Sequence, residues 1–477
     1  MVTTKFSNRV HNLGTTTPDV FLDRFSPIDG LEIFKTPLTT QTDVDTLFTN
    51  ISLQGSKFQD LGVINAARIL ISACDKIRRR KDEINEAVLL ETGKPESLIE
   101  GEFEAAINFM VSLAGLAQFQ NGRVIPSLNP KKIVHTRNQP YGVAALITSH
   151  NTPIPNYAWK LAPSFLSLNS SILKPSELTS LSAQKFCESF LESTPPEFMV
   201  NLVHGGPETV VALLDNRPEL VSFTGSFRTG LIIKNLTKNY SPKLILEMGG
   251  SNPIIVCSSA NLERAAKTIV ESAFSNSGQR CASGRRLLVK TELKGQLIDY
   301  IRKFLVELID RTPQGSFSGL LIDDKARETH NELIQKFRES GSQVEVFPMK
   351  SDSMDRQHVE PALVIHEKGR QSAIKEEIFS PILSIEEFES NNEALRSANN
   401  SQYALTASVW TQDMEEAHFF SSNLKAGVVN VNGPTHGAEF QFPFGGPKDS
   451  GNGTKVVGMY CLAEYSFEKV VSFTHGE

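Results

Sequence analysis

The fold class is decided by the stretch Gly142-Val143-Ala144-Ala145-Leu146-Ile147. Its unbroken apolar character is typical of a strand that is covered on both faces, as strands of parallel sheets are. Short β-prone runs of the same kind follow at residues 171–173, 199–203 and 220–223. Helical patterns lie between them, at residues 155–166, 182–191 and 209–214. This alternation predicts an α/β fold with a doubly wound parallel sheet, a layout that commonly binds nucleotides.

The pattern changes on either side of that region. Upstream, residues 43–116 show the helical spacing of apolar side chains, so helices should dominate there. After Gly250 a second alternation predicts another α/β domain, with strands at residues 253–256, 286–289, 343–346, 362–365, 382–387, 407–410 and 427–431. Residues 124–140 and 466–477 are predicted to form extended arms. We expect these arms to pair with a neighbouring subunit, because unpaired strand edges are liabilities.

The composition is that of an ordinary soluble globular protein. The chain has 477 residues, 40% hydrophobic and 21% charged, a length that suggests two or three domains. A net charge of −6 and a pI near 6.0 argue against nucleic acid and membrane surfaces as partners. Five cysteines without CxxC spacing argue against a disulfide framework and a zinc site. The chain shows no signal peptide or membrane-spanning run, so we expect a cytoplasmic protein without a metal.

Cys281 is the leading candidate for a nucleophile. It lies 34 residues after Glu247, and a thiolate with a carboxylate that activates water can oxidise an aldehyde through a thioester. A free thiol is only about 3% ionised at pH 7, so the site must help. A helix is expected to end near residues 274–277, where backbone amides could face the sulfur. The alternative is a buried inert cysteine, which we expect for Cys74, Cys187, Cys257 and Cys461.

Two further side chains stand where predicted strands end. Glu247 follows an apolar run and precedes a glycine turn, where backbone can approach a ligand closely. Asn151 follows the strand at 142–147 and could donate its amide to a developing oxyanion. Taken singly, each has a structural alternative: Glu247 as a capping or salt-bridge partner, and Asn151 as a turn residue.

Two strand-to-helix turns are candidates for cofactor binding. In Lys174-Pro175-Ser176-Glu177, a lysine can reach ribose or phosphate and an acid can accept from a ribose hydroxyl. In Phe223-Thr224-Gly225-Ser226, backbone amides and a hydroxyl can face a diphosphate. Neither turn is a GxGxxG or Walker sequence, so their order along the chain is more informative than either string.

Seven motifs occur in an order and spacing that resembles the NAD(P)-dependent aldehyde dehydrogenase superfamily. They are Asn151, Lys174-Pro175-Ser176-Glu177, Phe223-Thr224-Gly225-Ser226, Glu247-Met248-Gly249-Gly250, Gly278-Gln279-Arg280-Cys281, Glu376-Glu377-Ile378-Phe379 and Pro443-Phe444-Gly445-Gly446. The resemblance spans nearly the whole chain. It implies that Cys281 is the nucleophile, Glu247 the general base, and Asn151 the oxyanion donor together with the Cys281 amide.

The same resemblance implies cofactor residues and a domain plan. The implied cofactor contacts are Lys174 and Glu177 at the adenosine ribose, Thr224, Gly225 and Ser226 at the diphosphate, and Glu377 and Phe379 at the nicotinamide. Residues 1–123 and 141–248 would form the NAD-binding domain, residues 249–446 the catalytic domain, and 124–140 with 466–477 an oligomerisation arm of a homodimer or homotetramer. NAD is favoured over NADP, because Glu177 would repel a 2′-phosphate.

Three local strings, at residues 246–253, 278–287 and 201–209, look like the succinylglutamate-semialdehyde dehydrogenase branch. This resemblance implies a carboxylate-bearing semialdehyde as substrate. Arg280 could pair with that carboxylate, although a structural salt bridge is the stronger alternative. The residues that we expect to contact the substrate are Thr152, Trp159, Arg280, Ala282, His436 and Phe444. The chain departs from common relatives at His150, Thr152, Ser380 and Lys455, and Lys455 replaces an acid, which weakens any proton-relay role there.

Two other classes of function compete with this reading. A non-catalytic structural protein on the same scaffold would be signalled by loss of Cys281, Glu247 or Asn151, and all three are present. A cofactor-free cysteine hydrolase would need a histidine base near the thiol. Among the ten histidines, only His150 lies in a recognised site loop.

Overall fold

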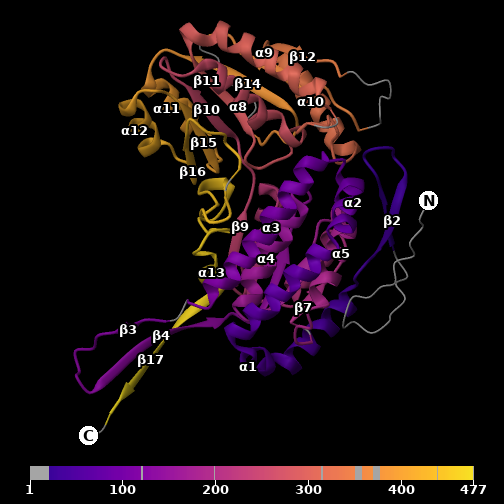
Figure 1. The fold of residues 1–477 in the computed structure, drawn as a ribbon, viewed down its shortest axis with the longest axis vertical. Helices are drawn as coiled ribbons and strands as arrows, with labels where there is room; N and C mark the ends of the chain where they lie inside the picture. The colour runs from indigo at the N-terminus through magenta and orange to yellow at the C-terminus, as the bar shows by residue number, and fades with distance from the viewer. Residues whose placement is uncertain are drawn as a thin grey trace.

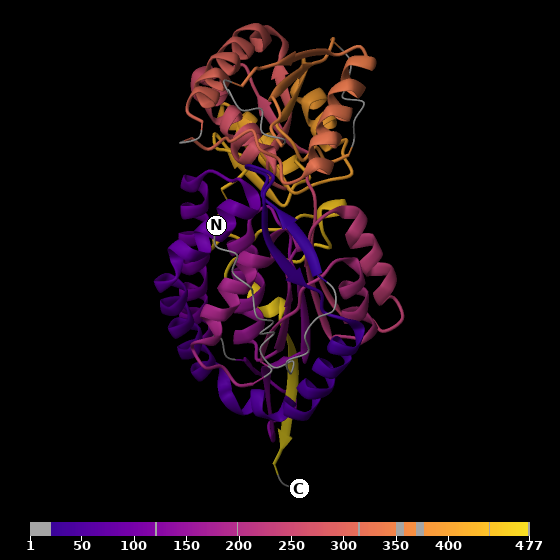
Figure 2. The same ribbon diagram turned by 90° about the vertical axis from the view of Figure 1, so that its right-hand side faces the viewer.

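The computed structural model describes residues 21–119, 122–197, 199–312, 315–349, 357–368, 376–437 and 439–475. Two bodies, each built on its own β-sheet, lie one above the other, and a narrow β arm projects from the lower body (Figures 1 and 2). The chain begins with an antiparallel hairpin formed by β1 (Phe21–Phe25) and β2 (Glu32–Pro37). Residues 1–20 of the predicted NAD-binding domain lie outside the described part of the chain.

Helices follow the hairpin, as the apolar spacing over residues 43–116 predicts. They are α1 (Gln41–Arg79), α2 (Lys81–Thr92) and α3 (Glu96–Ala117). Thr40 and Asp43 form a reciprocal capping box that satisfies orphan amides at the start of α1. The buried faces of these helices pack with β5 and α4 in the largest hydrophobic core.

The lower body contains a five-stranded parallel sheet, which confirms the prediction from residues 142–147. Its strands are β5 (Val143–Ile147), β6 (Ser170–Lys174), β7 (Val200–Leu202), β8 (Leu220–Thr224) and β9 (Lys243–Glu247). The connecting helices are α4 (Pro153–Leu166), α5 (Ser180–Leu191), α6 (Pro207–Asp215) and α7 (Phe227–Thr237). The strand order is β7-β6-β5-β8-β9. The winding direction therefore reverses between β5 and β8, where a ligand crevice is expected at the carboxyl ends.

The upper body contains a seven-stranded sheet in the order β12-β13-β14-β11-β10-β15-β16. All seven strands expected after Gly250 are present, as β10 (Asn252–Val256), β11 (Gly284–Lys290), β12 (Gln343–Val346), β13 (Ala362–Ile365), β14 (Ile382–Phe388), β15 (Thr406–Trp410) and β16 (Val428–Val431). Its helices are α8 (Leu262–Phe274), α9 (Lys294–Asp310), α10 (Asp324–Glu339), α11 (Asn391–Asn399) and α12 (Met414–Asn423). Only the edge strand β12 runs antiparallel to its neighbour.

The two predicted arm segments pair with each other within the chain. The arm contains β3 (Val124–Ile125), β4 (Lys132–Pro140) and β17 (Ser466–Thr474), in the order β17-β4-β3. The β4–β17 register runs from Pro140↔Ser466 to Lys132↔Thr474, and the short helix α13 (Cys461–Glu464) precedes β17. Each segment therefore pairs with one edge of the other, and the expected pairing with a neighbouring subunit stays a prediction. Among the residues that the structure describes, none pairs with the other edge of β17.

Candidate active site

The crevice predicted at the reversal of winding is a cavity of about 660 Å³, within the usual size range of ligand sites. It lies between the two bodies, since its lining comes from the carboxyl ends of β5, β6, β8 and β9 and also from the start of α10. Every predicted catalytic and cofactor residue lines it: Asn151, Lys174, Glu177, Thr224, Gly225, Ser226, Glu247, Cys281, Glu377 and Phe379.

The loop between α8 and β11 presents Cys281 to this cavity. The predicted end of a helix at Phe274 is confirmed, and a tight turn follows it, with left-handed φ values of 56° at Asn276 and 51° at Ser277. Such values are costly for residues other than glycine and persist only where the surroundings hold them. The fully buried Arg285 holds this loop by donating to the carbonyls of Gly278 and Ser380. Among the five cysteines, Cys281 alone is not fully buried.

The electrostatics of Cys281 correct one sequence-based expectation. We expected the site to ionise the thiol, but burial, reinforced by the carboxylates of Glu247 and Glu377, raises the pKa of Cys281 well above its ordinary value. The hydrogen bond from the Ala282 amide to the sulfur opposes this shift only weakly. The raised pKa keeps the resting thiol protonated, and the Glu247 carboxylate is one of the two acidic groups that interact with it.

Glu247 ends β9 with its side chain buried, and its Oε1 has no hydrogen-bond partner within the described structure. Burial raises the pKa of Glu247, whereas the Cys281 hydrogen bond and the charge of Lys160 act in the opposite direction. Lys160 is a buried residue of α4 whose Nζ donates to Ser222 Oγ over 3.0 Å. Ser222 Oγ in turn lies 2.9 Å from the Tyr465 hydroxyl. Sequence reasoning missed Lys160, although a lysine inside the apolar pattern of α4 was an available signal.

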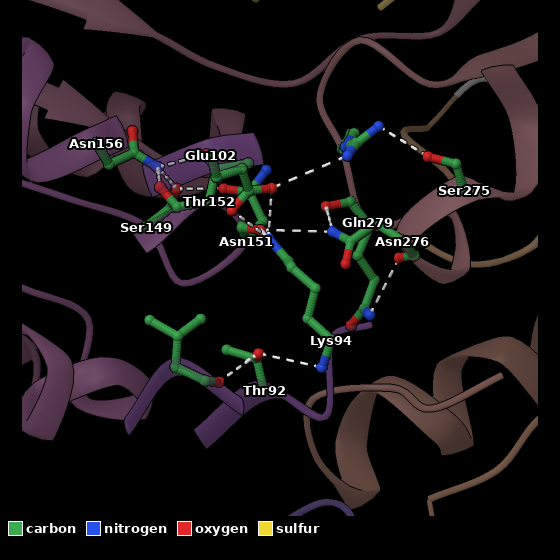
Figure 3. A network of polar contacts seen from close by, with 12 residues as sticks. Thr92, Lys94, Glu102, Ser149, Asn151, Thr152, Asn156, Ser275, Asn276 and Gln279 are labelled. Carbon is green, nitrogen blue, oxygen red and sulfur yellow. Dashed lines mark hydrogen bonds and ion pairs between the residues drawn. The ribbon is translucent and has the colours of Figure 1, made fainter. Parts of the chain in front are cut away.

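The amide of Asn151 is oriented by a chain of side-chain hydrogen bonds (Figure 3). The Ser149 hydroxyl donates to Asn151 Oδ1 over 2.7 Å, and Asn156 Nδ2 donates to Ser149 Oγ over 3.2 Å. Because the Ser149 hydroxyl engages the amide oxygen, the NH₂ group of Asn151 is the end left to donate. Asn156 also donates to the carbonyl and hydroxyl of Thr152, at 3.0 and 2.9 Å, which fixes the start of α4.

The other end of the cavity has the features of a dinucleotide site. Ser226 caps α7, so the positive end of that helix opens toward the space where a diphosphate would lie. A Cβ added at Gly225 would come within 2.5 Å of the Phe223 ring, so the close backbone turn requires glycine. Lys174 Nζ lies 3.7 Å from Glu177 Oε2. Burial lowers the pKa of Lys174, while Glu177 acts to raise it. The residues present therefore fit a nicotinamide dinucleotide.

Glu377 and Phe379 connect this end to Cys281. Glu377 Oε1 accepts from the Gly250 amide over 3.2 Å, and burial raises the pKa of Glu377 to about 7. Phe379 contacts the ring of His150 edge-on, with the centroids 6.1 Å apart. Burial lowers the pKa of His150 to about 4, so this residue is neutral at physiological pH.

The predicted substrate residues lie beside this cavity rather than in its lining. Ala282 and Phe444 belong to the main hydrophobic core, and Trp159 packs against it. Arg280 Nη1 donates to Ser275 Oγ over 2.8 Å, and its Nη2 lies 3.9 Å from Glu102. His436 is neutral, because burial lowers its pKa to about 3, and its Nδ1 has no partner within the described residues. Substrate contact by these residues, and by Thr152, stays a prediction.

Lys455 donates to the carbonyl of Gly445 over 2.5 Å. Burial lowers the pKa of Lys455. Within the described ranges, no group of three or more histidine, cysteine or acidic side chains is arranged to hold a metal ion. No helix in those ranges combines the length and apolar character required to cross a bilayer.

Comparisons with known proteins agree with this geometry. The model of the aldehyde dehydrogenase family matches residues 15–471. Retinaldehyde dehydrogenase 3 of Homo sapiens is 31% identical over 437 residues, which cover 89% of this chain and 83% of that protein. Betaine aldehyde dehydrogenase of Staphylococcus aureus, solved in complex with NAD⁺, superposes with a TM-score of 0.87 at 26% identity, covering 95% of this chain and 93% of that one.

A third relative was solved with the phosphorylated cofactor. NADP-dependent glyceraldehyde-3-phosphate dehydrogenase of Bacillus halodurans C-125, complexed with NADP, superposes with a TM-score of 0.89 at 27% identity and covers 96% of both chains. Sequence, fold and site geometry lead to one conclusion: the chain belongs to the aldehyde dehydrogenase family and is an enzyme of that class.

Proposed function

We propose that the protein oxidises an aldehyde to a carboxylic acid with NAD(P)⁺, through a thioester on Cys281 that Glu247 helps to hydrolyse. The observation that carries this proposal is that Cys281, Glu247 and Asn151 line one cavity, where the thiol and the Glu247 carboxylate shift each other's pKa. A nucleophile, a base and an oxyanion donor in one cavity are the parts that acyl chemistry requires.

The proposed acylation begins with the Cys281 proton. Glu247 accepts that proton as the sulfur bonds to the aldehyde carbon, and the Asn151 amide with the Cys281 backbone amide donates to the oxyanion. A nicotinamide held beside Glu377 and Phe379 would supply the hydride acceptor that oxidises this carbon, so that its carbonyl re-forms. What remains on the protein is a thioester at Cys281, one C–H bond having been replaced by the C–S bond.

Hydrolysis of the thioester needs a base that is ionised near neutral pH. After Glu247 has released the Cys281 proton to solvent, it takes a proton from water as the water oxygen bonds to the acyl carbon. The C–S bond then breaks to release the acid, and the proton on Glu247 returns to the Cys281 thiolate. The raised pKa of Glu247 suits this role, because a base is most effective when its pKa lies near the working pH. Transfer of the acyl group to another thiol would not require this carboxylate.

For the cofactor, we propose NAD in preference to NADP. The S. aureus neighbour was solved with NAD⁺ and the B. halodurans neighbour with NADP, so the fold accepts both. Glu177 is half exposed at the ribose end and would repel a 2′-phosphate, whereas Lys174, 3.7 Å away, offsets part of that repulsion. Comparing kcat/KM with NAD and NADP at saturating aldehyde tests this preference, and equal values would contradict it.

For the substrate, we propose a semialdehyde that carries a carboxylate. The support is the set of strings shared with the succinylglutamate-semialdehyde dehydrogenase branch and the position of Arg280 next to Cys281. Because Arg280 already contacts Ser275 and Glu102, a substrate carboxylate would have to share its guanidinium. The three relatives are named after three different aldehydes, so their names do not favour one substrate class over another.

A panel of aldehydes tests both activity and substrate class. Purified protein with NAD should form NADH from succinic semialdehyde faster than from propanal or benzaldehyde. A preference for propanal or benzaldehyde would contradict the carboxylate proposal alone. No NADH with any aldehyde would contradict the dehydrogenase mechanism and favour a structural role or a hydrolase. The hypothesis of a cysteine hydrolase already lacks support, because the side chain that interacts with the thiol is Glu247 and not a histidine.

The remaining proposals concern assembly and location. We propose that the arm joins subunits of a homodimer or homotetramer, since the free edge of β17 carries the exposed side chains Phe467, Val470 and Phe473. Light scattering measures the number of subunits in the intact protein and in a variant that ends at residue 465. The same number of subunits in both would contradict a role of the arm in assembly. The five unpaired cysteines support a reducing, cytoplasmic location.

A further inference from the structure

Lys94 is a buried charge that the mechanism above does not use. It lies in the short connection between α2 and α3, where Gly93 ends α2 in the left-handed conformation with φ of 61° and Pro95 precedes α3. Proline restricts the backbone of the residue before it, so both neighbours limit where Lys94 can point. Lys94 is only 2% exposed and does not line the cavity.

All three protons of the Lys94 ammonium have acceptors. Its Nζ lies 2.7 Å from each carboxylate oxygen of Glu102 and 2.6 Å from the backbone carbonyl oxygen of Asn151. An ammonium group has three N–H donors and no acceptor. The three contacts therefore engage all of its donors and require the amine to be protonated. Lys94 therefore donates a hydrogen bond directly to the backbone of Asn151, the proposed oxyanion donor (Figure 3).

The same contacts reach the loop that carries the nucleophile. Glu102 lies 3.9 Å from Arg280, the residue before Cys281. Asn276, at the strained turn of that loop, donates from its Nδ2 to the Asn151 carbonyl over 3.4 Å and to the Gln279 carbonyl over 3.2 Å. The Asn151 carbonyl is thus tied both to helix α3, through Lys94 and Glu102, and to the Cys281 loop.

We propose that Lys94 is a positioning residue. Together with Glu102, it fixes the distance and orientation of the Asn151 side-chain amide relative to the Cys281 sulfur. The proposal rests on the roles proposed above for Asn151 and Cys281. A buried ion pair contributes little net stability in general, because desolvation cancels much of the attraction. Its value here is geometric: a displacement of about 1 Å at a reacting group can reduce a rate on the order of 10²-fold.

The experiment is a double-mutant cycle between Lys94→Met and Asn151→Ala, measured as the rate of the NADH burst with NAD and the fastest aldehyde of the panel. Methionine keeps the volume of the side chain but cannot donate to the Asn151 carbonyl. We expect Lys94→Met to slow the burst about 10- to 100-fold. In the Asn151→Ala background the same change should cost less than about threefold, because the amide that Lys94 positions is gone.

Lys294→Met is the matched control. Lys294 also donates to a backbone carbonyl, that of His366 at 3.0 Å, and pairs with a carboxylate, Glu387 at 3.1 Å, but in the upper sheet away from the cavity. The Lys294→Met variant should have a lower melting temperature, but its NADH burst should be as fast as that of the unchanged protein. If Lys94→Met does not fold, Lys94→Gln, which keeps an amide donor, enters the same cycle with a smaller expected loss.

Each outcome distinguishes the inference from the proposed function. A burst rate unchanged in Lys94→Met, or losses that multiply fully in the double variant, overturns the positioning role while the mechanism stands. An unchanged burst rate in Asn151→Ala alone overturns the oxyanion role and, with it, this inference. Melting curves of each variant, with NAD affinity measured by nucleotide fluorescence, show whether a loss of rate comes from damage to the fold or to cofactor binding.

Discussion

The two ends of the cavity are built in different ways. At the cofactor end, Lys174 ends β6, and Glu177 and Ser226 lie in the short turns after β6 and β8; Glu177 is half exposed. At the catalytic end, Glu247 and Glu377 are buried, and burial raises the pKa of each. The positive charges that act on them, Lys160 on Glu247 and Arg285 on Glu377, come from α4 and β11, which lie far away in the chain. The cofactor end therefore depends on local turns, and the catalytic end on long-range contacts between buried charges.

This difference has a consequence for mutations. A side chain at the end of a strand can be changed with little effect beyond its own ligand contact. A buried charge at the catalytic end is balanced by its neighbours, so that a change there alters protonation as well as position. Substitutions at the catalytic end should therefore have the largest effects on rate. Substitutions at the cofactor end should instead alter the preference between NAD and NADP.

Glu247→Gln should have the largest effect. Loss of the base should reduce steady-state turnover on the order of 10²- to 10⁴-fold, the usual range for general-base catalysis. The amplitude of the NADH burst should survive, because amplitude counts the sites that become acylated and not the speed of acylation. Rapid-mixing absorbance at the NADH band measures both quantities. A burst amplitude that disappears together with turnover would contradict the assignment of Glu247 to hydrolysis.

Asn151→Ala should come next, with a loss on the order of 10²- to 10³-fold in kcat, as expected for removal of one oxyanion donor. The matched variant is Ser149→Ala, which leaves the Asn151 amide in place but removes the hydroxyl that orients it. It should cost less than Asn151→Ala under the same conditions. A rate in Asn151→Ala close to that of the unchanged protein would refute the oxyanion role.

Glu177→Gln should act on preference and leave the chemistry intact. Without the carboxylate, repulsion of a 2′-phosphate is removed, and the positive charge of the neighbouring Lys174 remains. We expect the ratio of kcat/KM for NADP to that for NAD to rise on the order of 10-fold, with kcat at saturating NAD nearly unchanged. Initial rates at varied cofactor concentration provide the ratio. A large drop in kcat would instead make Glu177 part of the catalytic end.

Lys160→Met should have the smallest effect, a shift of the pH profile. The charge of Lys160 favours ionised Glu247, so removing it should raise the pKa of Glu247 further. Since the base must be ionised, hydrolysis of the thioester rises with pH through that pKa, and the midpoint of the profile should move to higher pH. Steady-state rates across the pH range, under conditions where hydrolysis limits, detect this. A midpoint that moves to lower pH would contradict the proposed coupling.

The arms and the thiol show where the sequence-based predictions were incomplete. Extended segments at 124–140 and near the C-terminus were predicted correctly, but their pairing with each other joins residues more than 300 positions apart, which no local pattern encodes. The site was expected to help the thiol ionise, yet the neighbouring positive charge of Arg280 contacts Ser275 and Glu102. Burial and two carboxylates then dominate the environment of the sulfur.

The amino-acid sequence by itself determined the alternation of strands and helices, the ends of β5, β8 and β9 at which Asn151, Ser226 and Glu247 lie, and Cys281 as the candidate nucleophile. These depend on periodicity and turn chemistry, which act over a few residues. Only the tertiary structure decided how Lys94, Lys160 and Arg285 surround those groups, because burial and the balance of charge are summed over side chains that are distant along the chain. The protonation of Cys281 and the orientation of Asn151 follow from that sum.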